Sequence, residues 1–191
     1  MKKALIITLI GMLLGTGIVS AQEKETNTLV VYYSATGTTQ AIAEKVAELT
    51  DADLFALEPV DPYIEEDLDW TNRESRVCKE HEAGEEGVEL ETVTDWEDYD
   101  TVYIGYPIWW QDASWVMDTF VESNDFSDKT VIPFCTSQAS GYGESGKHLA
   151  EKADAGNWIE GRNFFGSSTD EVEEWIESLA TEEATEEATK E

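Results

Sequence analysis

Short apolar runs rich in β-branched residues alternate along this chain with segments whose apolar residues recur at helical spacing. The runs predict strands at 28–33, 53–57, 101–106 and 130–135, and a weaker one at 161–165, which contains an Arg and an Asn. The helical spacing predicts helices at 38–49, 113–122, 145–153 and 170–179. Strands that alternate with helices predict an α/β fold, in which helices cover both faces of a parallel sheet.

One connection departs from this alternation. Residues 58–99 form a long, acidic segment between the second and third predicted strands. A structureless loop of that length is unusual in a compact domain, so we expect an ordered insertion. Its stretch 67–76 is the candidate for a short helix.

The two ends of the chain differ from its body. Residues 1–21 have two lysines, an apolar stretch and then small residues, which is the layout of a secretory signal peptide cleaved after Ala21. An uncleaved membrane anchor and a buried N-terminal helix are the alternatives. The expected organisation is a signal peptide at 1–21, a linker at 22–27, one domain at 28–180 and an acidic tail at 181–191, either a frayed helix or solvated. This organisation predicts an exported protein, secreted or held in the cell envelope.

Acidic residues far outnumber basic ones, 42 to 12, and the net charge is −30. Such a charge argues against nucleic acid and anionic lipid as partners, because both require basic patches. Membrane contact is therefore expected only through an uncleaved signal segment. A bound anion would need strong local donors.

Cysteine and histidine are scarce. Cys78 and Cys135 could form a disulfide in an oxidising compartment, or Cys135 could be a free thiol inside a strand. The only histidines are His81 and His148, and no Cys-x-x-Cys pair occurs, so no metal site is expected.

The strongest local signal follows the first strand. There the chain reads Ser34, Ala35, Thr36, Gly37, Thr38 and Thr39, and a helix is predicted to begin at once. Hydroxyls and unpaired backbone N–H groups at a helix N-terminus form an anion site without a basic residue. Gly37 allows the backbone to fold closely around a phosphate. An ordinary threonine-rich capping turn is the alternative.

This Ser-x-Thr-Gly-x-Thr loop resembles the phosphate loop of the flavodoxins. Gly-Tyr-Pro-Ile-Trp-Trp at 105–110 is similar to the second flavin loop of one flavodoxin subfamily, and 133–143 resembles its third. The resemblance implies a flavodoxin-like, doubly wound, five-stranded parallel sheet of order 2-1-3-4-5, with FMN at the switch point of the sheet. It adds to the residues of the first loop the cofactor-binding candidates Pro107, Ile108, Trp109, Trp110, Thr136, Ser137, Ser140, Gly141, Tyr142 and Gly143.

Within this resemblance, Trp109 and Trp110 are the expected stacking faces for the flavin ring, with Tyr142 as a second wall. The sequence departs from the subfamily in three places: Thr38 stands where Asn is usual, Gln111 replaces a customary Gly, and the segment 112–114 lacks an expected Pro. Gln111 therefore puts the substrate-facing chemistry in question more than FMN binding.

Three functions remain open. An FMN-dependent, low-potential electron carrier outside the cytoplasm is favoured, because no side chain is placed as an obvious catalytic acid or nucleophile. An FMN-dependent NAD(P)H:quinone-type reductase is the alternative, and a flavin-free binding module is the third. The expected partners are FMN and either a redox protein or a small electron acceptor.

Overall fold

A computed structural model describes residues 27–84, 88–166 and 170–189. The strands are β1 (Thr28–Tyr32), β2 (Asp53–Ala56), β3 (Thr101–Trp109), β4 (Asp112–Ala113), β5 (Thr130–Thr136), β6 (Asn157–Trp158) and β7 (Arg162–Phe164). The α-helices are α1 (Thr38–Thr50), α2 (Arg76–Ala83), α3 (Val116–Ser123), α4 (Ser145–Ala153) and α5 (Asp170–Thr189). Two short 3₁₀ helices, η1 (Glu65–Leu68) and η2 (Trp96–Asp98), lie between β2 and β3.

The sheet runs β2-β1-β3-β5, and both β6 and β7 pair with the far side of β5. All of these pairs are parallel, and β4 alone among the described strands runs antiparallel, beside the end of β3. The predicted α/β class and strand order are confirmed. The predicted fifth strand differs in one respect, because its position is shared by two short pieces, β6 and β7.

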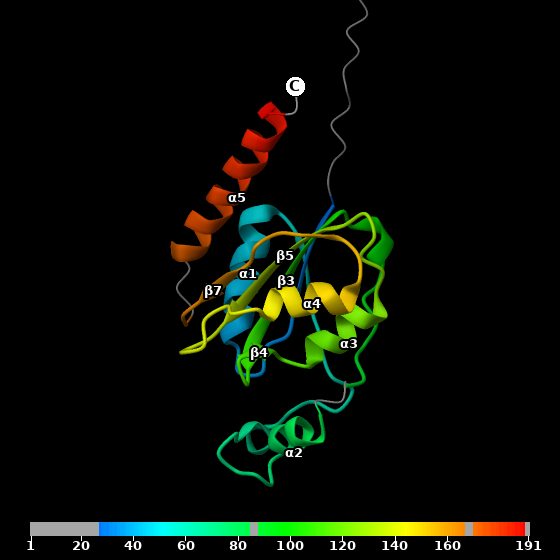
Figure 1. Ribbon diagram of the computed structural model, residues 1–191, viewed down its shortest axis with the longest axis vertical. Helices are drawn as coiled ribbons and strands as arrows, with labels where there is room; N and C mark the ends of the chain where they lie inside the picture. Colours follow the sequence, from blue (N-terminus) through cyan, green and yellow to red (C-terminus); the bar gives the residue numbers. More distant parts are fainter. Residues whose placement is uncertain (1–26, 85–87, 167–169, 190–191) are drawn as a thin grey trace, which may run out of the picture.

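The helices form a layer on each face of the sheet (Figure 1). On one face, α1 and α5 cover Val30, Tyr103 and Phe134 of the central strands. On the other face, α3 and α4 pack over Val31 and Ile104. Because side chains of successive strand residues point to opposite faces, the continuous apolar runs of β1, β3 and β5 supply both layers.

The helix predicted at 67–76 is wrong in position. The structure has a 3₁₀ turn at Glu65–Leu68, and the α-helix begins only at Arg76. Ser75 is the N-cap, and its hydroxyl accepts a hydrogen bond from the backbone N–H of Cys78 at 3.4 Å. Between the two helices, Asp69 and Asn72 accept hydrogen bonds from backbone N–H groups two residues ahead, a local bonding pattern that competes with helix formation.

The acidic insertion is attached to the domain through a network of hydrogen bonds around Glu80 of α2. The Glu80 carboxylate accepts hydrogen bonds from Tyr63 Oη at 2.6 Å and Trp115 Nε1 at 3.0 Å, and from Arg76 Nε at 2.7 Å. Trp115 is buried at the start of α3. The described part of the insertion is therefore ordered, as its length predicts, and α2 lies beyond the end of the sheet that carries β4 (Figure 1).

Of the features predicted for the two ends of the chain, the structure describes only those at the C-terminal end. The predicted closing helix is present, and α5 continues as a helix to Thr189, through most of the segment expected to be a tail. The predicted signal peptide at 1–21 lies outside the described residues. Within the described residues, no helix is long and apolar enough to cross a membrane.

Cys78 and Cys135 are both buried and free, so the structure does not support the disulfide alternative. The two thiols have different partners: Cys78 Sγ donates to the backbone carbonyl of Trp70 at 3.4 Å, and Cys135 Sγ donates to Asn163 Oδ1 at 3.3 Å. Burial raises the pKa of the Cys135 thiol to about 12, which keeps it protonated.

We therefore expect both thiols to react slowly in the native protein at about pH 8, because the thiolate is the reactive form and neither sulfur is exposed. After denaturation without reductant, both should react rapidly with a chromogenic disulfide reagent. Absence of free thiols in the denatured, non-reduced chain would show that a disulfide forms after all.

Candidate functional site

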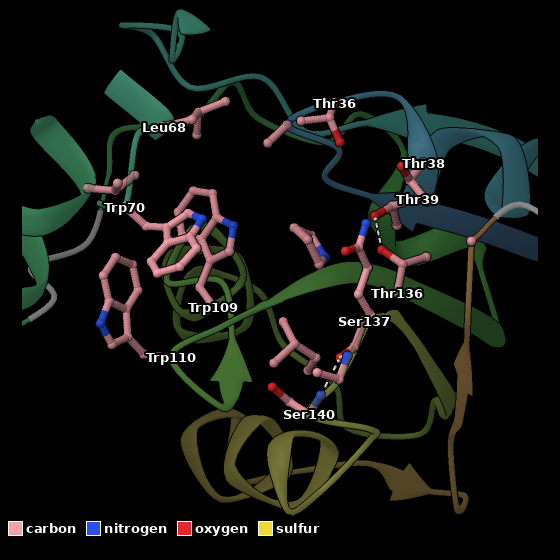
Figure 2. Close-up of a pocket in the computed structure, with 17 residues that line it drawn as sticks. Thr36, Thr38, Thr39, Leu68, Trp70, Trp109, Trp110, Thr136, Ser137 and Ser140 are labelled. Carbon is pink, nitrogen blue, oxygen red and sulfur yellow. Dashed lines mark hydrogen bonds between the residues drawn. The ribbon is translucent and has the colours of Figure 1, made fainter. Parts of the chain in front are cut away.

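A cavity of about 710 Å³ lies at the carboxyl ends of β1, β3 and β5. Its walls come from four segments: the loop after β1, the end of β3, the loop after β5 and the acidic insertion. Figure 2 shows threonines on one side of the cavity and Trp109, Trp110, Trp70 and Leu68 on the other. The cavity thus has a hydroxyl-lined end and an aromatic end.

The hydroxyl-lined end is built by the loop before α1. Gly37, with a φ of 84°, takes the left-handed conformation at the helix N-cap, and no side chain caps the first turn of α1. The first backbone N–H groups of α1 are therefore open to a ligand, at the positive end of the helix dipole. Thr36, Thr38 and Thr39 line the cavity beside them.

A hydrogen bond joins this first loop to the third. The hydroxyls of Thr39 and Thr136, both buried, lie 2.8 Å apart (Figure 2). One hydroxyl proton is used in their mutual hydrogen bond, and the other remains available to a bound acceptor. The pair therefore holds the two loops together and keeps one donor free.

The Ser34 hydroxyl is buried at the base of the same loop, and its Oγ has no hydrogen-bond partner in the structure. A buried polar atom without a partner costs free energy, and native proteins keep few of them. An anion at the start of α1 would supply the missing acceptor. This hydroxyl, the uncapped helix and the threonines are the groups that could donate to a phosphate bound at this loop.

The aromatic end is built on a tight hairpin between β3 and β4. Trp109 pairs with Asp112, so Trp110 and Gln111 form a two-residue turn with φ values of 45° and 74°. Two positive φ values define the type I′ turn, which normally carries Asn-Gly. A Gly, which is customary at position 111, would adopt this positive φ without backbone strain, whereas the backbone of Gln111 is strained.

Aromatic contacts hold both tryptophans. Trp109 packs edge-on against Tyr33 at 5.7 Å, Tyr63 at 5.4 Å and Trp115 at 4.6 Å between ring centroids. The Trp110 indole is 39% exposed and stacks on His81 of α2 with ring centroids 4.4 Å apart. The insertion therefore helps to position the hairpin.

The third loop follows β5 and closes the cavity from below in Figure 2. Ser137 Oγ accepts hydrogen bonds from the backbone N–H of Ser140 at 2.9 Å and of Ala139 at 3.3 Å. These bonds curl residues 137–140 into a turn. Thr136, Ser137 and Ser140 line the cavity.

The structure brings most of the predicted site residues to one cavity. Those that line it are Ala35, Thr36, Thr38, Thr39, Pro107, Ile108, Trp109, Trp110, Thr136, Ser137 and Ser140. Ser34, Gly37, Gly141, Tyr142 and Gly143 are not among the lining residues.

Tyr142, expected as a second wall, does not line the cavity in this structure. Its phenol lies against Gly146 and Gly161, where no room remains for a Cβ atom, and it hydrogen-bonds Tyr106. Burial raises the pKa of Tyr142 to about 12. Tyr142 therefore packs inside the domain, and the turn at Gly141 and Gly143, both with positive φ, directs it there.

Sequence reasoning missed six residues of the lining: Leu68, Trp70, Val77, Gln138, Ala139 and Gly166. Gln138 and Ala139 lie inside the predicted third loop and could have been included. Leu68, Trp70 and Val77 belong to the acidic insertion, where their apolar character among acidic neighbours was the available signal. None of the lining residues that the structure describes carries a charged side chain.

The strained turn yields a prediction. Gln111→Gly should raise the free energy of unfolding by about 0.5–1 kcal/mol, because relief of left-handed strain exceeds the added flexibility of the unfolded chain. Gln138→Gly is the matched control, since the φ of Gln138 is not positive and the same exchange should give no gain there. Urea denaturation of the two variants measures the difference, and equal effects would contradict the strain.

Comparisons with known proteins agree with this geometry. A sequence profile of the flavodoxin family, described as Flavodoxin, matches residues 27–179. A candidate flavoprotein of Bacteroides uniformis is 41% identical, with a TM-score of 0.75 over 81% of this chain and 99% of that chain. One of Bacteroides eggerthii is 36% identical, with a TM-score of 0.73 over 81% and 98%.

A flavoprotein of Lactobacillus acidophilus, solved in complex with FMN, is 25% identical, with a TM-score of 0.56 over 72% of this chain and 93% of that chain. A search among curated proteins gives no match. Because the family profile covers the domain from before β1 to the middle of α5, this chain belongs to the flavodoxin family.

Proposed function

We propose that this flavodoxin binds FMN in the cavity described above and carries electrons at low potential outside the cytoplasm. One observation carries the proposal: a phosphate site of neutral donors and an aromatic wall face the same cavity at the switch point of the sheet. Family membership and the FMN complex of the Lactobacillus acidophilus relative support FMN as the cofactor.

The residues present fit this cofactor. Ser34, Thr36 and the first N–H groups of α1 would hold the phosphate. Trp109 and Trp110 would offer indole faces to the ring system, and the turn at 137–140 would face its polar edge with the side chains of Ser137, Gln138 and Ser140. Gly141, Tyr142 and Gly143 would act behind this turn, as its support.

FMN supplies reversible electron transfer, and the protein sets how readily it is reduced. Reduction adds negative charge to the cofactor, and neither a basic side chain in the described lining nor the net charge of −30 compensates for it. The reduced state is therefore disfavoured, which lowers the potential. A low potential suits an electron donor.

The NAD(P)H-dependent reductase is the weaker reading. The diphosphate of a nicotinamide dinucleotide requires basic or helix-terminal donors at its own site. The cavity provides one such set, which the FMN phosphate would occupy, and its described lining has no Lys or Arg. This observation favours a carrier.

The buried Ser34 hydroxyl gives a test with two readouts of opposite sign. Ser34→Ala should stabilise the apoprotein by up to about 1 kcal/mol, because it removes an unsatisfied buried polar atom. The same change should weaken FMN binding about tenfold, because it removes a hydrogen bond to a charged group. Thermal unfolding of the apoprotein and fluorescence titration with FMN measure the two effects.

Ser114→Ala is the matched control, since Ser114 Oγ is also buried without a partner but lies at the start of α3, outside the loop that precedes α1. It should stabilise the apoprotein in the same way and leave the FMN affinity unchanged. If Ser34→Ala and Ser114→Ala behave alike toward FMN, the phosphate is bound elsewhere.

The location outside the cytoplasm rests on residues 1–21, whose lysines, apolar stretch and small residues match a secretory signal. Expression of the full chain in a bacterium, followed by mass spectrometry, should yield a mature protein that begins at Gln22 in the exported fraction. Retention of the intact chain in the cytoplasm would refute export.

A further inference from the structure

The wall that the acidic insertion adds to the cavity, formed by Leu68, Trp70 and Val77, has no role in the proposed function so far. We propose that Trp70 binds the ring of a small, neutral, planar aromatic electron acceptor of the quinone class. This inference rests on the proposed function, because it names the acceptor to which the FMN-bound protein passes electrons.

The exposure of Trp70 is the first observation. Its side chain is 73% exposed although it lines a cavity, whereas Val77 beside it is buried. Among the described residues, no aromatic ring is paired with Trp70, in contrast to Trp109, Trp110 and Trp115, which all contact other rings. An indole at the rim of a cavity with a free face is a stacking surface.

The backbone around Trp70 is the second observation, because it is held firmly although the side chain is not. The Trp70 N–H donates to the carbonyl of Leu68 at 2.9 Å, and the Trp70 carbonyl accepts from Cys78 Sγ at 3.4 Å. Asp69 Oδ1 accepts from both the N–H and the hydroxyl of Thr71, at 3.0 and 2.6 Å. This turn fixes the backbone from which the indole projects, so little backbone order has to be gained on binding.

Charge selects the kind of ring. The described lining is uncharged, and acidic residues directly flank the wall, with Asp67 before Leu68 and Asp69 before Trp70. An anionic ring would approach carboxylates without a basic residue in the lining to pair with, whereas a neutral ring gains the full stacking and burial energy. Neutral acceptors are therefore favoured over anionic ones of the same shape.

The redox balance fits a quinone. A quinone bound at this wall would take up two electrons from fully reduced FMN, and two protons from the reduced flavin and water, and would leave as the hydroquinone. The reductant is thus the FMN-bound protein itself, reloaded by its own electron donor. No covalent bond to the protein is needed, in agreement with the protonated, buried Cys135 near the cavity.

Equilibrium dialysis of the oxidised, FMN-loaded protein tests the inference without any turnover. The probes are 1,4-naphthoquinone and its 2-sulfonate, which share a ring and differ in charge. The neutral probe should bind at least about tenfold more tightly than the sulfonate, because of the flanking carboxylates. Trp70→Ala should lower the affinity for the neutral probe about tenfold, whereas Trp70→Phe should retain most of that affinity. The affinity of both variants for FMN should stay within about twofold of the unchanged protein.

Ile64→Ala is the matched control, because Ile64 is an exposed apolar residue of the same insertion, 59% exposed, that does not line the cavity. It should leave naphthoquinone binding unchanged. If Trp70→Ala does not weaken the binding of naphthoquinone to the FMN-loaded protein, or if both probes bind equally, the inference is overturned. The proposed function is not affected by either result. A parallel loss of FMN in Trp70→Ala assigns Trp70 to the cofactor and also overturns it, whereas a chain that takes up no FMN refutes the proposed function.

Discussion

Parallel pairing of β3 with β1 on one side and β5 on the other is the constraint on which the site depends. The register that aligns Tyr32 with Gly105, and Pro107 with Thr136, makes these strands end at one edge of the sheet. The loops that follow them therefore meet, although about seventy residues and thirty residues separate them in the sequence. The hydrogen bond between Thr39 and Thr136 joins the first of these loops to the third.

Within this frame, a strongly acidic chain has to hold an anion. In the site proposed here, neutral donors would hold it, namely hydroxyls and the open N-terminus of α1, which need no basic side chain. The insertion also keeps its charges away from the cavity: Glu65 and Glu66 are exposed, whereas Leu68 and Val77 line the cavity. The acidic surface should thus disfavour the approach of anionic molecules, and the uncharged lining should favour the binding of neutral ones.

The sequence predicted the parts of the fold that short-range patterns encode. The strands of the central sheet follow from apolar runs, and the turn before α1 follows from Gly37, so both could be predicted from the sequence. The position of α2 could not be read as well, because local hydrogen bonds of Asp69 and Asn72 delay the helix until Ser75 caps it.

Long-range packing explains the other differences. Tyr142 lies in the loop where a cofactor wall is expected, but its ring packs against Gly146 and Gly161, which have no side chains to exclude it. Trp70 joins the cavity because Glu80, Arg76 and Tyr63 attach the insertion to Trp115, a set of contacts between segments far apart in the sequence. The sequence periodicity of the insertion does not predict where the insertion packs relative to the sheet.

We propose that the loop after β1 binds the phosphate of FMN through neutral donors. Parallel titrations of the apoprotein with FMN and with riboflavin, which lacks the phosphate, test this binding mode. FMN should bind at least about a hundredfold more tightly than riboflavin, since several charge-assisted hydrogen bonds depend on the phosphate. Equal affinities for the two flavins would contradict it.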